Sequence, residues 1–573
     1  MKNQEIANLL REIAILLEIK GESRFRVLAY EEAARQLENL SEPVEEYSRK
    51  SELQSIPGIG EAIAQKIDEY LKQGKIHFLD ELSREIPRGV ADYTRIPGVG
   101  PRTAGLFYRE LGISTFEELR SALAEGKIRL LPRLGAKSEE KIRKGLAFLS
   151  DQLGRMLLGY ALPVVDEVVA FLKERAPVDK ISPAGSIRRM KETIGDIDIL
   201  VASRRAEEVS GALVSFPGVR DVLARGPSKT SIRTGQGMQI DLRVVDPDSF
   251  GAALQYFTGS KEHNVALRET AQKKGYKVNE YGIYRLDTGV RVGGTAEEEI
   301  YEALGMEWIP PEIRENQGEI ELAMSKKLPR LVVEEDLRGD LHVHTHWSDG
   351  STSVRDIAEA ARKKGYNYLG LCDHTQSLVV ASGLKPDQLR SRRLEIDQWN
   401  HDNQGFFVFD GVEVNILADG ELDMNDRDLA DRDLVIAGLH SGLGQEKDRI
   451  MRRLERALKN PHIQILSHPT GRLLQRRNPY QLDLDTLFSL ASRESIILEI
   501  NSQPERLDLK DSDARQARDG YGIPMVITSD AHNPAQLGYI RLGIAQARRG
   551  WLTAEDIVNT FSLERLKRFL KRP

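Results

Sequence analysis

Residues 185–200 read GSIRRMKETIGDIDIL, and this stretch predicts the fold of the middle of the chain. Asp196 and Asp198 are separated by one residue in a segment that alternates apolar and polar side chains. Their carboxylates therefore leave the same face of a β-strand, about 7 Å apart along it. This spacing suits carboxylates that share a pair of divalent cations about 4 Å apart, so the stretch predicts a two-metal site.

Residues around these aspartates add the other groups that phosphate chemistry requires. Gly185 and Ser186 end an apolar stretch and offer a closely approachable backbone and a hydroxyl, which together can hold a phosphate. Asp241 lies in a second alternating segment, QIDLRVV at residues 239–245, and is a third candidate metal ligand. This constellation resembles the palm of the nucleotidyltransferase superfamily, and GSxRR followed by GDxD resembles family X DNA polymerases in particular.

The composition indicates the size and class of the protein. At 573 residues the chain is too long for one core and should contain about three to five units. A hydrophobic fraction of 40% and a charged fraction of 30% are ordinary for a soluble globular protein, and no apolar run reaches the roughly 20 residues of a membrane span. The N-terminus opens into an amphipathic helix pattern rather than a signal peptide. The single cysteine, Cys372, excludes an internal disulfide, so we expect a reducing cytoplasm.

Two copies of one turn pattern lie in the helical first part of the chain. Residues 56–60 read IPGIG and residues 96–100 read IPGVG, and each copy opens a helix, so the repeat resembles helix-hairpin-helix motifs. Such turns bind the DNA backbone without reading sequence, because glycines let a phosphate approach and the helix N-terminus supplies N–H donors. The expected DNA-binding glycines are Gly58, Gly60, Gly98 and Gly100.

The charge balance restricts how DNA can be bound. The net charge of −6 argues against a globally basic nucleic-acid binder, so binding must rest on local patches and backbone amides. Residues 101–150 carry 10 Lys or Arg against 6 Asp or Glu, which favours a DNA-facing surface there over a merely solvated helical face. A degraded third hairpin at residues 131–137 is expected to be structural.

The family X resemblance also covers the first helices. It places Arg26 and Tyr30 where the family contacts the 5'-phosphate of a gap, and Lys66 at the position of the Schiff-base lysine of its lyase. The family's neighbouring basic residue is replaced by Ala62, which weighs against lyase chemistry. An ordinary solvated lysine is the alternative for Lys66.

A second element of the family follows the palm. YFTGS at residues 256–260 resembles the family's sugar-binding element, with Asn264 and Arg268 at the spacing of residues that reach the nucleotide or base pair and the template strand. The resemblance implies that Tyr256 and Phe257 pack against the nucleotide sugar and that the backbone at Gly259 excludes a 2'-hydroxyl.

The resemblance also implies the roles of the palm residues. Asp196 and Asp198 bridge two Mg²⁺ or Mn²⁺ ions, while Asp241 binds the ion that activates the primer 3'-hydroxyl. Ser186 and Arg189 hold the incoming triphosphate. Arg188 is expected to be a surface charge, since adjacent arginines on a turn seldom share a target.

The last part of the chain predicts a second enzyme. Seven of the 11 histidines lie at or near the ends of short apolar segments in this part, and helical segments separate several of these, which describes a TIM-like barrel with a site on one rim. Nine nitrogen and oxygen ligands, with no thiolate, suit two or three Mn²⁺, Zn²⁺ or Fe²⁺ ions. These ligands are His342, His344, Asp349, His374, Glu413, His440, His468, Asp530 and His532.

Their motifs, HxH, DH, GxE, xHS, SHP and SDAH in this order, resemble a PHP (polymerase and histidinol phosphatase) domain. The resemblance implies a distorted (β/α)7 TIM-like barrel with 3'-5' exonuclease activity, and AP endonuclease or 3'-phosphatase activity remains open. Asp373 is expected to orient His374 from behind, and Cys372 to be a small buried apolar residue.

The predicted organisation is multidomain, with helical N-terminal domains, an α+β nucleotidyltransferase palm and thumb, and the PHP barrel. The domains are a lyase-like domain 1–90, fingers 91–153, palm 154–258, thumb 259–317, linker 318–337 and PHP nuclease domain 338–573.

We therefore predict a monomeric DNA polymerase that fills short gaps in base excision repair, with a separate 3'-5' exonuclease. Gapped or primed DNA and deoxynucleoside triphosphates are the expected partners, and no membrane is involved. Two alternatives remain: a phosphoesterase of small phosphate esters tethered to DNA by its N-terminal half, and a non-catalytic DNA-binding scaffold.

Overall fold

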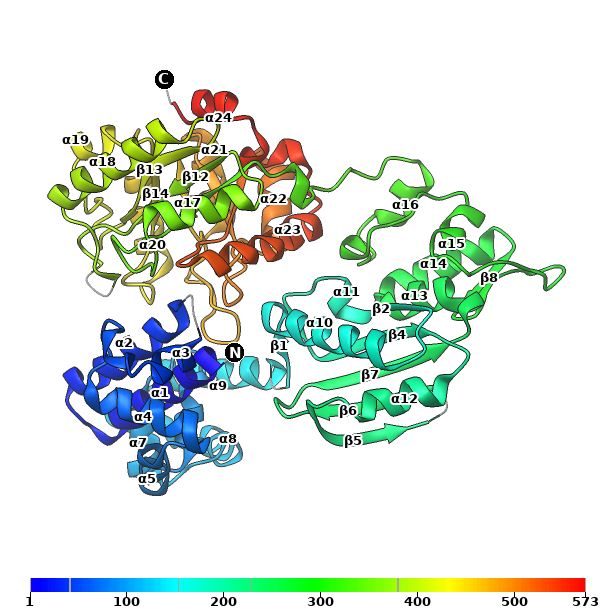
Figure 1. The fold of residues 1–573 in the computed structure, drawn as a ribbon, viewed down its shortest axis with the longest axis horizontal. Coiled ribbons are helices and arrows are strands. Elements are labelled where there is room, and N and C mark those ends of the chain that lie inside the picture. The colour runs from blue at the N-terminus through cyan, green and yellow to red at the C-terminus, as the bar shows by residue number, and fades with distance from the viewer. Residues whose placement is uncertain (1, 41–42, 153, 227, 379–380, 572–573) are drawn as a thin grey trace.

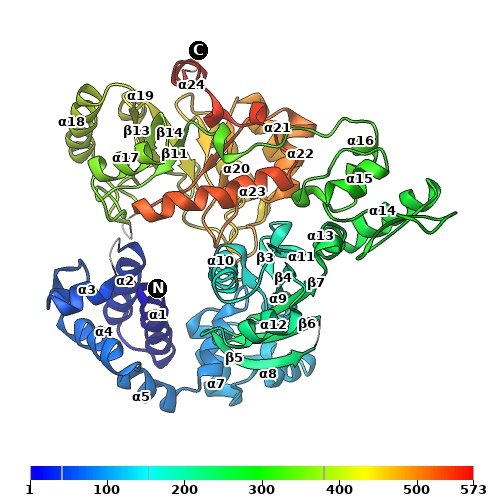
Figure 2. The same ribbon diagram turned by 45° about the vertical axis from the view of Figure 1, so that its right-hand side comes forward.

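The computed structural model describes residues 2–40, 43–152, 154–226, 228–378 and 381–571 (Figure 1). The N-terminal helices lie beneath the C-terminal barrel, and the palm and thumb extend away to one side (Figures 1 and 2). From the thumb, an extended segment returns to the barrel. Among the described residues, no helix combines the length and the apolar character needed to cross a bilayer.

Nine helices with one continuous hydrophobic core form the first part of the described chain. Both predicted hairpins start helices: α4 follows Gly60 and α7 follows Gly100, while Gly58 and Gly98 have φ of +77° and +91°. The degraded third copy takes the same course, with Arg133 at φ +65° before α9. The helices are α1 Lys2–Lys20, α2 Arg24–Asn39, α3 Val44–Arg49, α4 Glu61–Gln73, α5 His77–Glu85, α6 Arg88–Asp92, α7 Pro101–Leu111, α8 Phe116–Ala124 and α9 Ala136–Gln152.

The palm is a five-stranded sheet in the order β2-β4-β7-β6-β5. Strands β4 and β7 run parallel at its centre, with Asp198 directly opposite Asp241. Helices α10 and α12 pack apolar residues against this sheet. The elements are β1 Met156–Leu157, α10 Leu158–Arg175, β2 Lys180–Pro183, α11 Gly185–Arg188, β3 Thr193–Ile194, β4 Asp196–Ala202, α12 Ala206–Val214, β5 Val219–Arg225, β6 Lys229–Thr234 and β7 Gln239–Val245.

The thumb is built on helices α13 and α14 and a three-stranded antiparallel sheet. The segment 318–337, expected as a linker, differs from that expectation in its first part. It contains helix α16, whose Ile320 and Ala323 are buried in the thumb core, because apolar residues recur there at helical spacing. The elements are α13 Phe250–Thr258, α14 Lys261–Lys273, β8 Tyr276–Asn279, β9 Gly282–Arg285, β10 Arg291–Gly293, α15 Glu298–Ala303 and α16 Glu319–Met324.

A nearly closed barrel of seven parallel strands, in sequence order β11 to β17, forms the C-terminal domain. The strands are short and buried along their whole length or nearly so, as expected where helices cover one face and side chains fill the other. A bridge between Val343 and Ala531 brings the first strand next to the last. The strands are β11 Gly339–Val343, β12 Tyr368–Leu371, β13 Phe407–Asn415, β14 Leu434–Gly438, β15 Ile465–Leu466, β16 Ile497–Asn501 and β17 Met525–Thr528. The helices are α17 Val354–Lys363, α18 Pro386–Asp402, α19 Asp426–Ala430, α20 Lys447–Leu458, α21 Leu484–Arg493, α22 Asp511–Tyr521, α23 Ile540–Arg549 and α24 Leu563–Leu570.

Candidate functional site

Three aspartates converge on the palm sheet. Asp196 and Asp198 leave one face of β4, and Asp241 lies beside Asp198 on the parallel strand β7. One carboxylate oxygen of each lies within 4.8 Å of the others, a separation at which they can share metal ions. Asp196 is exposed and Asp241 is buried, so the group opens to solvent on one side.

The pKa values of Asp198 and Asp241 are shifted in opposite directions. Burial, as the largest cause, and the nearby carboxylates of Asp196 and Asp241 together raise the pKa of Asp198 to about 7. Burial also acts to raise the pKa of Asp241, but hydrogen bonds from Lys229 and Gln239 outweigh it and hold this pKa below its usual value. Lys229 Nζ lies 2.7 Å from Asp241 Oδ2. Asp198 is therefore the carboxylate that most lacks a positive partner, and a cation would supply one.

Gly185 gives the predicted phosphate-binding turn its shape. It has φ of +59°, and a Cβ atom there would lie 2.1 Å from Asp198 Oδ2. Only glycine fits so close to the carboxylate. The turn continues as the four-residue helix α11, which carries Ser186 beside β4, the strand of Asp196 and Asp198.

The two arginines of the turn pair with different carboxylates and share Thr258. Arg188 donates to both carboxylate oxygens of Glu297 at 2.7 Å and to Thr258 Oγ1 at 2.6 Å. The expectation that Arg188 is a surface charge is therefore wrong, because Glu297 from the thumb neutralises it. Arg189 Nε donates to Glu315 Oε1 at 3.3 Å, and its Nη1 donates to the carbonyl of Thr258.

The YFTGS element lies next to this turn. A Cβ atom on Gly259 would lie 3.2 Å from Arg189 Nη1, so the two motifs meet. The rings of Tyr256 and Phe257 are 5.1 Å apart and half-buried at the end of α13. Asn264 donates to the carbonyl of Tyr256 at 2.7 Å, which fixes its amide. Arg268 is exposed on the next helix and has no place in this contact network.

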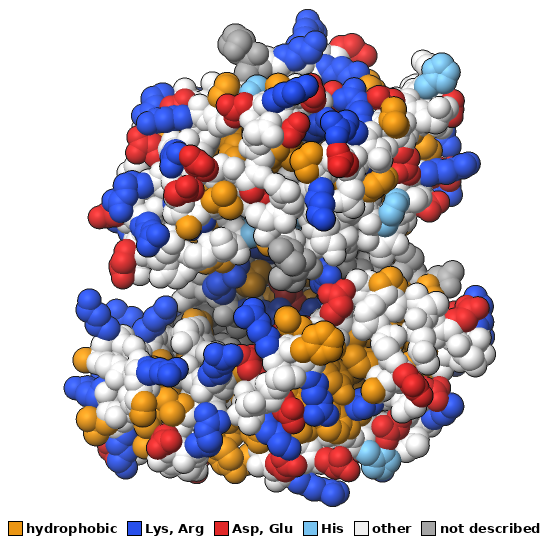
Figure 3. Space-filling model, turned by 90° about the vertical axis from the view of Figure 1, so that its left-hand side faces the viewer, with side chains coloured by type: hydrophobic (Ala, Val, Ile, Leu, Met, Phe, Trp, Pro, Cys, Tyr) orange, Lys and Arg blue, Asp and Glu red, His pale blue; other side chains and the backbone are white. Residues whose placement is uncertain are grey.

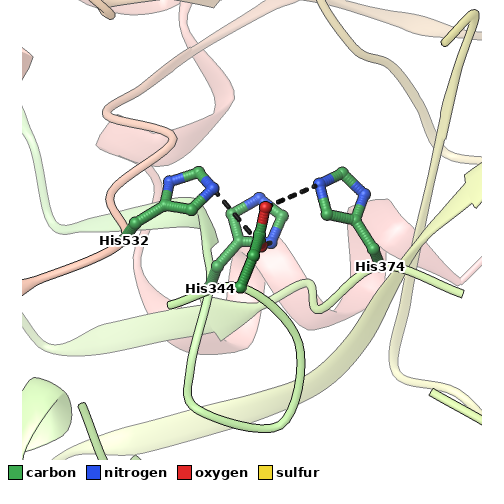
Figure 4. A group of neighbouring side chains, drawn as sticks. His344, His374 and His532 are labelled. Carbon is green, nitrogen blue, oxygen red and sulfur yellow. Dashed lines mark ion pairs between the residues drawn. The ribbon is translucent and has the colours of Figure 1, made fainter. Parts of the chain in front are cut away.

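The second cluster lies at the C-terminal ends of the barrel strands. Each predicted ligand is on a strand or on the loop that follows it, which is where such barrels carry their sites. Side chains of His344, His374 and His532 converge there from three separate segments (Figure 4). The three groups with metal-ligand spacing are His344, Asp349, His374 and His532; His342, His344 and Asp530; and His374, Glu413 and His440.

Glu413 lies at the centre of this cluster. Its carboxylate oxygens are 3.0 Å from His374 Nδ1, 3.2 Å from His440 Nε2 and 3.3 Å from His342 Nε2. His468, the ninth predicted ligand, joins through the same carboxylate, at 3.1 Å. Asp349 lies at the edge, 3.4 Å from His532 Nε2.

The cluster fits divalent metal ions. In the described structure, His344 Nδ1 and His440 Nδ1 are buried without a hydrogen-bond partner, and the contacts of His374 Nδ1 and His440 Nε2 with Glu413 lack hydrogen-bond geometry. Buried polar atoms without partners are costly, so metal coordination accounts for them. The donor set of imidazoles and carboxylates, without a thiolate, suits Zn²⁺, Mn²⁺ or Fe²⁺.

Two residues behind the ligands differ from the sequence-based interpretation. Glu499, which we had not predicted, accepts from His342 Nδ1 at 2.6 Å and thereby orients that ring. A carboxylate inside the apolar strand ILEIN at residues 497–501 was the available signal. Asp373 does not orient His374: it accepts from Thr345 and from the buried Arg392.

A third group of predicted residues surrounds Phe78 in the helical domain. Lys66 Nζ lies 4.9 Å and the Arg26 guanidinium 5.4 Å from the centre of its ring. Tyr30 stacks on the same ring at 6.3 Å. Burial lowers the pKa of Lys66, and the charge of Arg26 lowers it further.

Family models match the helical domains and the thumb. Residues 253–315 match the family model of the DNA polymerase beta thumb, residues 1–76 that of a helix-hairpin-helix domain, and residues 90–147 that of a SAM-like helix-hairpin-helix tandem. The DNA polymerase/3'-5' exonuclease PolX of Bacillus subtilis (strain 168) is 38% identical over 574 residues, which cover 100% of both chains. The chain belongs to the PolX family.

Two further relatives of this PolX family member match parts of it. DNA polymerase lambda of Rattus norvegicus is 28% identical over 344 residues, covering 55% of this chain and 56% of that protein. A probable phosphatase of Thermoanaerobacter sp. (strain X514) is 26% identical over 252 residues, covering 40% of this chain and 94% of that protein. The predictions of a family X polymerase with hairpin domains, a thumb and a PHP barrel are confirmed.

Proposed function

We propose that this PolX family member fills short gaps in DNA during repair, base excision repair included, and trims DNA 3'-ends at a second, separate site. The observation that carries the proposal is that one chain gathers two independent sets of metal ligands. Three aspartates lie on the palm and nine His, Asp and Glu residues lie at the barrel rim. Each set fits phosphate chemistry, and the two lie in different domains.

Nucleotide addition takes place on the palm. Asp196 and Asp198 hold two Mg²⁺ or Mn²⁺ ions, and Asp241 holds the one beside the primer end. When bound, these ions lower the pKa of the 3'-hydroxyl and neutralise charge on the triphosphate. Ser186 and Arg189 orient the triphosphate for in-line attack.

The thumb and palm position the rest of the nucleotide. Tyr256 and Phe257 pack on its sugar, and the backbone at Gly259 excludes a 2'-hydroxyl. The fixed amide of Asn264 supports this element from the next helix, and the exposed Arg268 reaches the template strand. Binding of DNA outside the site relies on backbone contacts at the glycines of the two hairpins, Gly58, Gly60, Gly98 and Gly100, and reads no sequence.

Removal of 3'-nucleotides takes place at the barrel rim, where the nine ligands hold two or three Mn²⁺, Zn²⁺ or Fe²⁺ ions. When bound, the ions activate a water molecule and stabilise the oxygens of a phosphodiester displacement. Glu413 and the histidines around it fix the geometry, and Glu499 holds His342 from behind. An AP endonuclease or a 3'-phosphatase activity would use the same chemistry at this site.

The chain acts as a monomer in the reducing cytoplasm, where its DNA and deoxynucleoside triphosphates are found. The domains are the six predicted above, with the first part of segment 318–337 assigned to the thumb because α16 packs into the thumb core. A reducing compartment agrees with a single cysteine, Cys372, which is buried.

A lyase activity is a second candidate function for the helical domain. The lowered pKa of Lys66 is the observation that favours it, because a neutral amine is the form that attacks an aldehyde. Arg26 and Tyr30, which share the Phe78 ring with Lys66, are placed to bind the 5'-phosphate of the same nucleotide.

Substrate preference tests the gap-filling proposal. Extension rates are measured with Mn²⁺ on duplexes that differ only in the downstream strand: none, one with a 5'-hydroxyl, and one with a 5'-phosphate at a one-nucleotide gap. We expect the 5'-phosphate gap to be extended fastest, because the helical domain binds that phosphate. Equal rates on all three would refute gap filling while leaving polymerase activity intact.

A further inference from the structure

The helical domain reaches the mouth of the barrel cluster. A cavity of about 380 Å³ lies between the helical domain, palm helix α10 and the barrel. Three of its lining residues, Asp349, Asp530 and His532, belong to the metal-ligand cluster. Two others, Arg11 and Arg35, come from the N-terminal helices. Figure 3 shows the surface hollowed between barrel and helices, with Lys and Arg side chains along the lower rim.

Arg35 lies next to Asp349, one of the ligands of the cluster. Its Nη1 lies 3.6 Å from Asp349 Oδ2, beyond hydrogen-bond distance. Both Nη1 and Nε are buried and have no hydrogen-bond partner in the described structure. Arg35 lines the cavity beside the metal-ligand cluster, and two of its donor nitrogens have no hydrogen-bond partner in the described structure. Such an arginine is suited to bind a phosphate.

The position of Arg35 is fixed by the first hairpin. Its Nη2 donates to both oxygens of Glu32, at 2.9 Å and 2.7 Å, one turn earlier on α2. Glu32 in turn packs on the hairpin glycine Gly58, where a Cβ atom would lie 2.7 Å from its Cγ. Glu32 and the first hairpin therefore hold the Arg35 guanidinium toward the cavity. This hairpin is itself proposed to bind DNA.

Helix α2 serves two sites with two faces. Arg26 and Tyr30 face the Phe78 ring, where the 5'-phosphate is proposed to bind. Arg35 is nine residues from Arg26, which places it about 180° round the helix and about 14 Å along it. The face of α2 that carries Arg35 is therefore independent of the 5'-phosphate site and available to a different strand end.

The barrel side of the cavity is also built for a strand. Arg506 and Gln503 line it from the loop after β16. That loop is held by the palm, since the Tyr160 hydroxyl lies 3.2 Å from Glu505 Oε1 and Gly159 packs closely on Pro504. The cavity volume falls in the range of about 300–1,000 Å³ that encloses small ligands, so it can hold the terminal nucleotide of a strand.

We infer that the helical domain completes the exonuclease site: Arg35 binds a backbone phosphate of the DNA 3'-end while the terminal nucleotide occupies the cavity and its phosphodiester lies on the barrel cluster. This inference rests on the proposed exonuclease function. Arg35 is a substrate-binding residue contributed by a domain otherwise assigned to the opposite strand end. Helix α2 then binds the strand end at the barrel with one face and the 5'-phosphate of a gap with the other.

The inference separates binding from chemistry. Arg35→Ala removes a charged hydrogen bond to phosphate, so the KM for shortening a labelled single strand with Mn²⁺ should rise about 10- to 100-fold with little change in kcat. Without metal, the Kd of the same fluorescent strand should rise by a similar factor. Arg35→Lys, which keeps the charge, should recover part of the loss. Hydrolysis of bis(4-nitrophenyl) phosphate, which has no neighbouring phosphate, and the metal content by mass spectrometry should not change.

Arg49→Ala is the matched control, because Arg49 is an exposed positive charge in the same domain whose ion pair is with a neighbouring surface Glu46. It should leave all four measurements as in the wild type. An unchanged KM for Arg35→Ala would overturn the inference, and so would loss of metal or of hydrolysis of the small ester. Faster shortening would also overturn it, since Arg35 would then close the site rather than bind substrate. If the wild type shortens no strand, the proposed exonuclease itself fails. If the wild type is active and Arg35→Ala is unaffected, only the inference about Arg35 fails.

Discussion

Replacing Asp198 by asparagine should make the metal-free palm more stable while abolishing nucleotide addition. Burial and the charges of Asp196 and Asp241 raise the pKa of Asp198 from 3.8 to about 7. The folded state therefore binds a proton that the unfolded chain has already released, and stability falls as pH rises from about 4 to 7. Asp198→Asn keeps the shape of the side chain and removes the charge that causes this loss.

The magnitude follows from the two pKa values. At about 1.4 kcal/mol per pH unit, a pKa raised from 3.8 to about 7 corresponds to about 4 kcal/mol of lost stability above pH 7. For a domain of about 100 residues, a change of about 1 kcal/mol moves the unfolding midpoint by about 4–8 °C, so the variant should unfold at least about 15 °C higher at pH 8. At pH 4, where the wild-type carboxyl is protonated in the folded state, the gain should disappear.

Calorimetry in EDTA from pH 4 to pH 8.5, on the wild type and Asp198→Asn, measures this difference. Mn²⁺ should then raise the wild-type midpoint at pH 8 and have less effect on the variant, since binding to the native state stabilises it. A difference between the two proteins that does not depend on pH, or a less stable variant at pH 8, would refute the argument that the three carboxylates repel one another.

Three further outcomes are expected. Gly185→Ala places a methyl group 2.1 Å from Asp198 Oδ2 and strains a φ of +59°, so primer extension should fall at least about 100-fold while exonuclease activity in the same preparation stays. Glu297→Ala removes the buried carboxylate that pairs with Arg188, so the free energy of unfolding of the thumb in urea should fall by about 3–5 kcal/mol. A fall of less than about 1 kcal/mol would contradict the buried network. Lys66→Ala should eliminate any adduct trapped by borohydride on an abasic 5'-end, and an adduct that persists would assign the lyase to another lysine.

The palm and barrel sites could be predicted because their ligands follow strand periodicity. Asp196 and Asp198 are two residues apart on one strand, so the sequence alone predicts that they share a face. Asp241 lies opposite Asp198 on the neighbouring strand β7. His342 and His344 bracket the end of β11 in the same way. Short motifs of this kind carry their own geometry, and no long-range contact is needed to interpret them.

Contacts between residues far apart in the chain could not be read from the sequence. Arg188 was expected on the surface, and its partner Glu297 lies 109 residues away in the thumb. Helix α16 was expected within a linker, because its few apolar residues gain a core only when the thumb packs on them. Glu499 and Arg35 were missed for the same reason: each acts on a ligand more than 100 residues distant, His342 and Asp349 respectively.

The central claim is that one chain carries two opposed active sites, and a single primer assay tests it most directly. A labelled primer on a short-gapped duplex is incubated with Mn²⁺, with and without deoxynucleoside triphosphates, using the wild type, Asp198→Ala and His374→Ala. We expect the wild type to extend with nucleotides and to shorten without them, Asp198→Ala to shorten only, and His374→Ala to extend only. Loss of both activities in either variant would contradict two independent sites, and shortening that survives His374→Ala would remove the barrel cluster from the reaction.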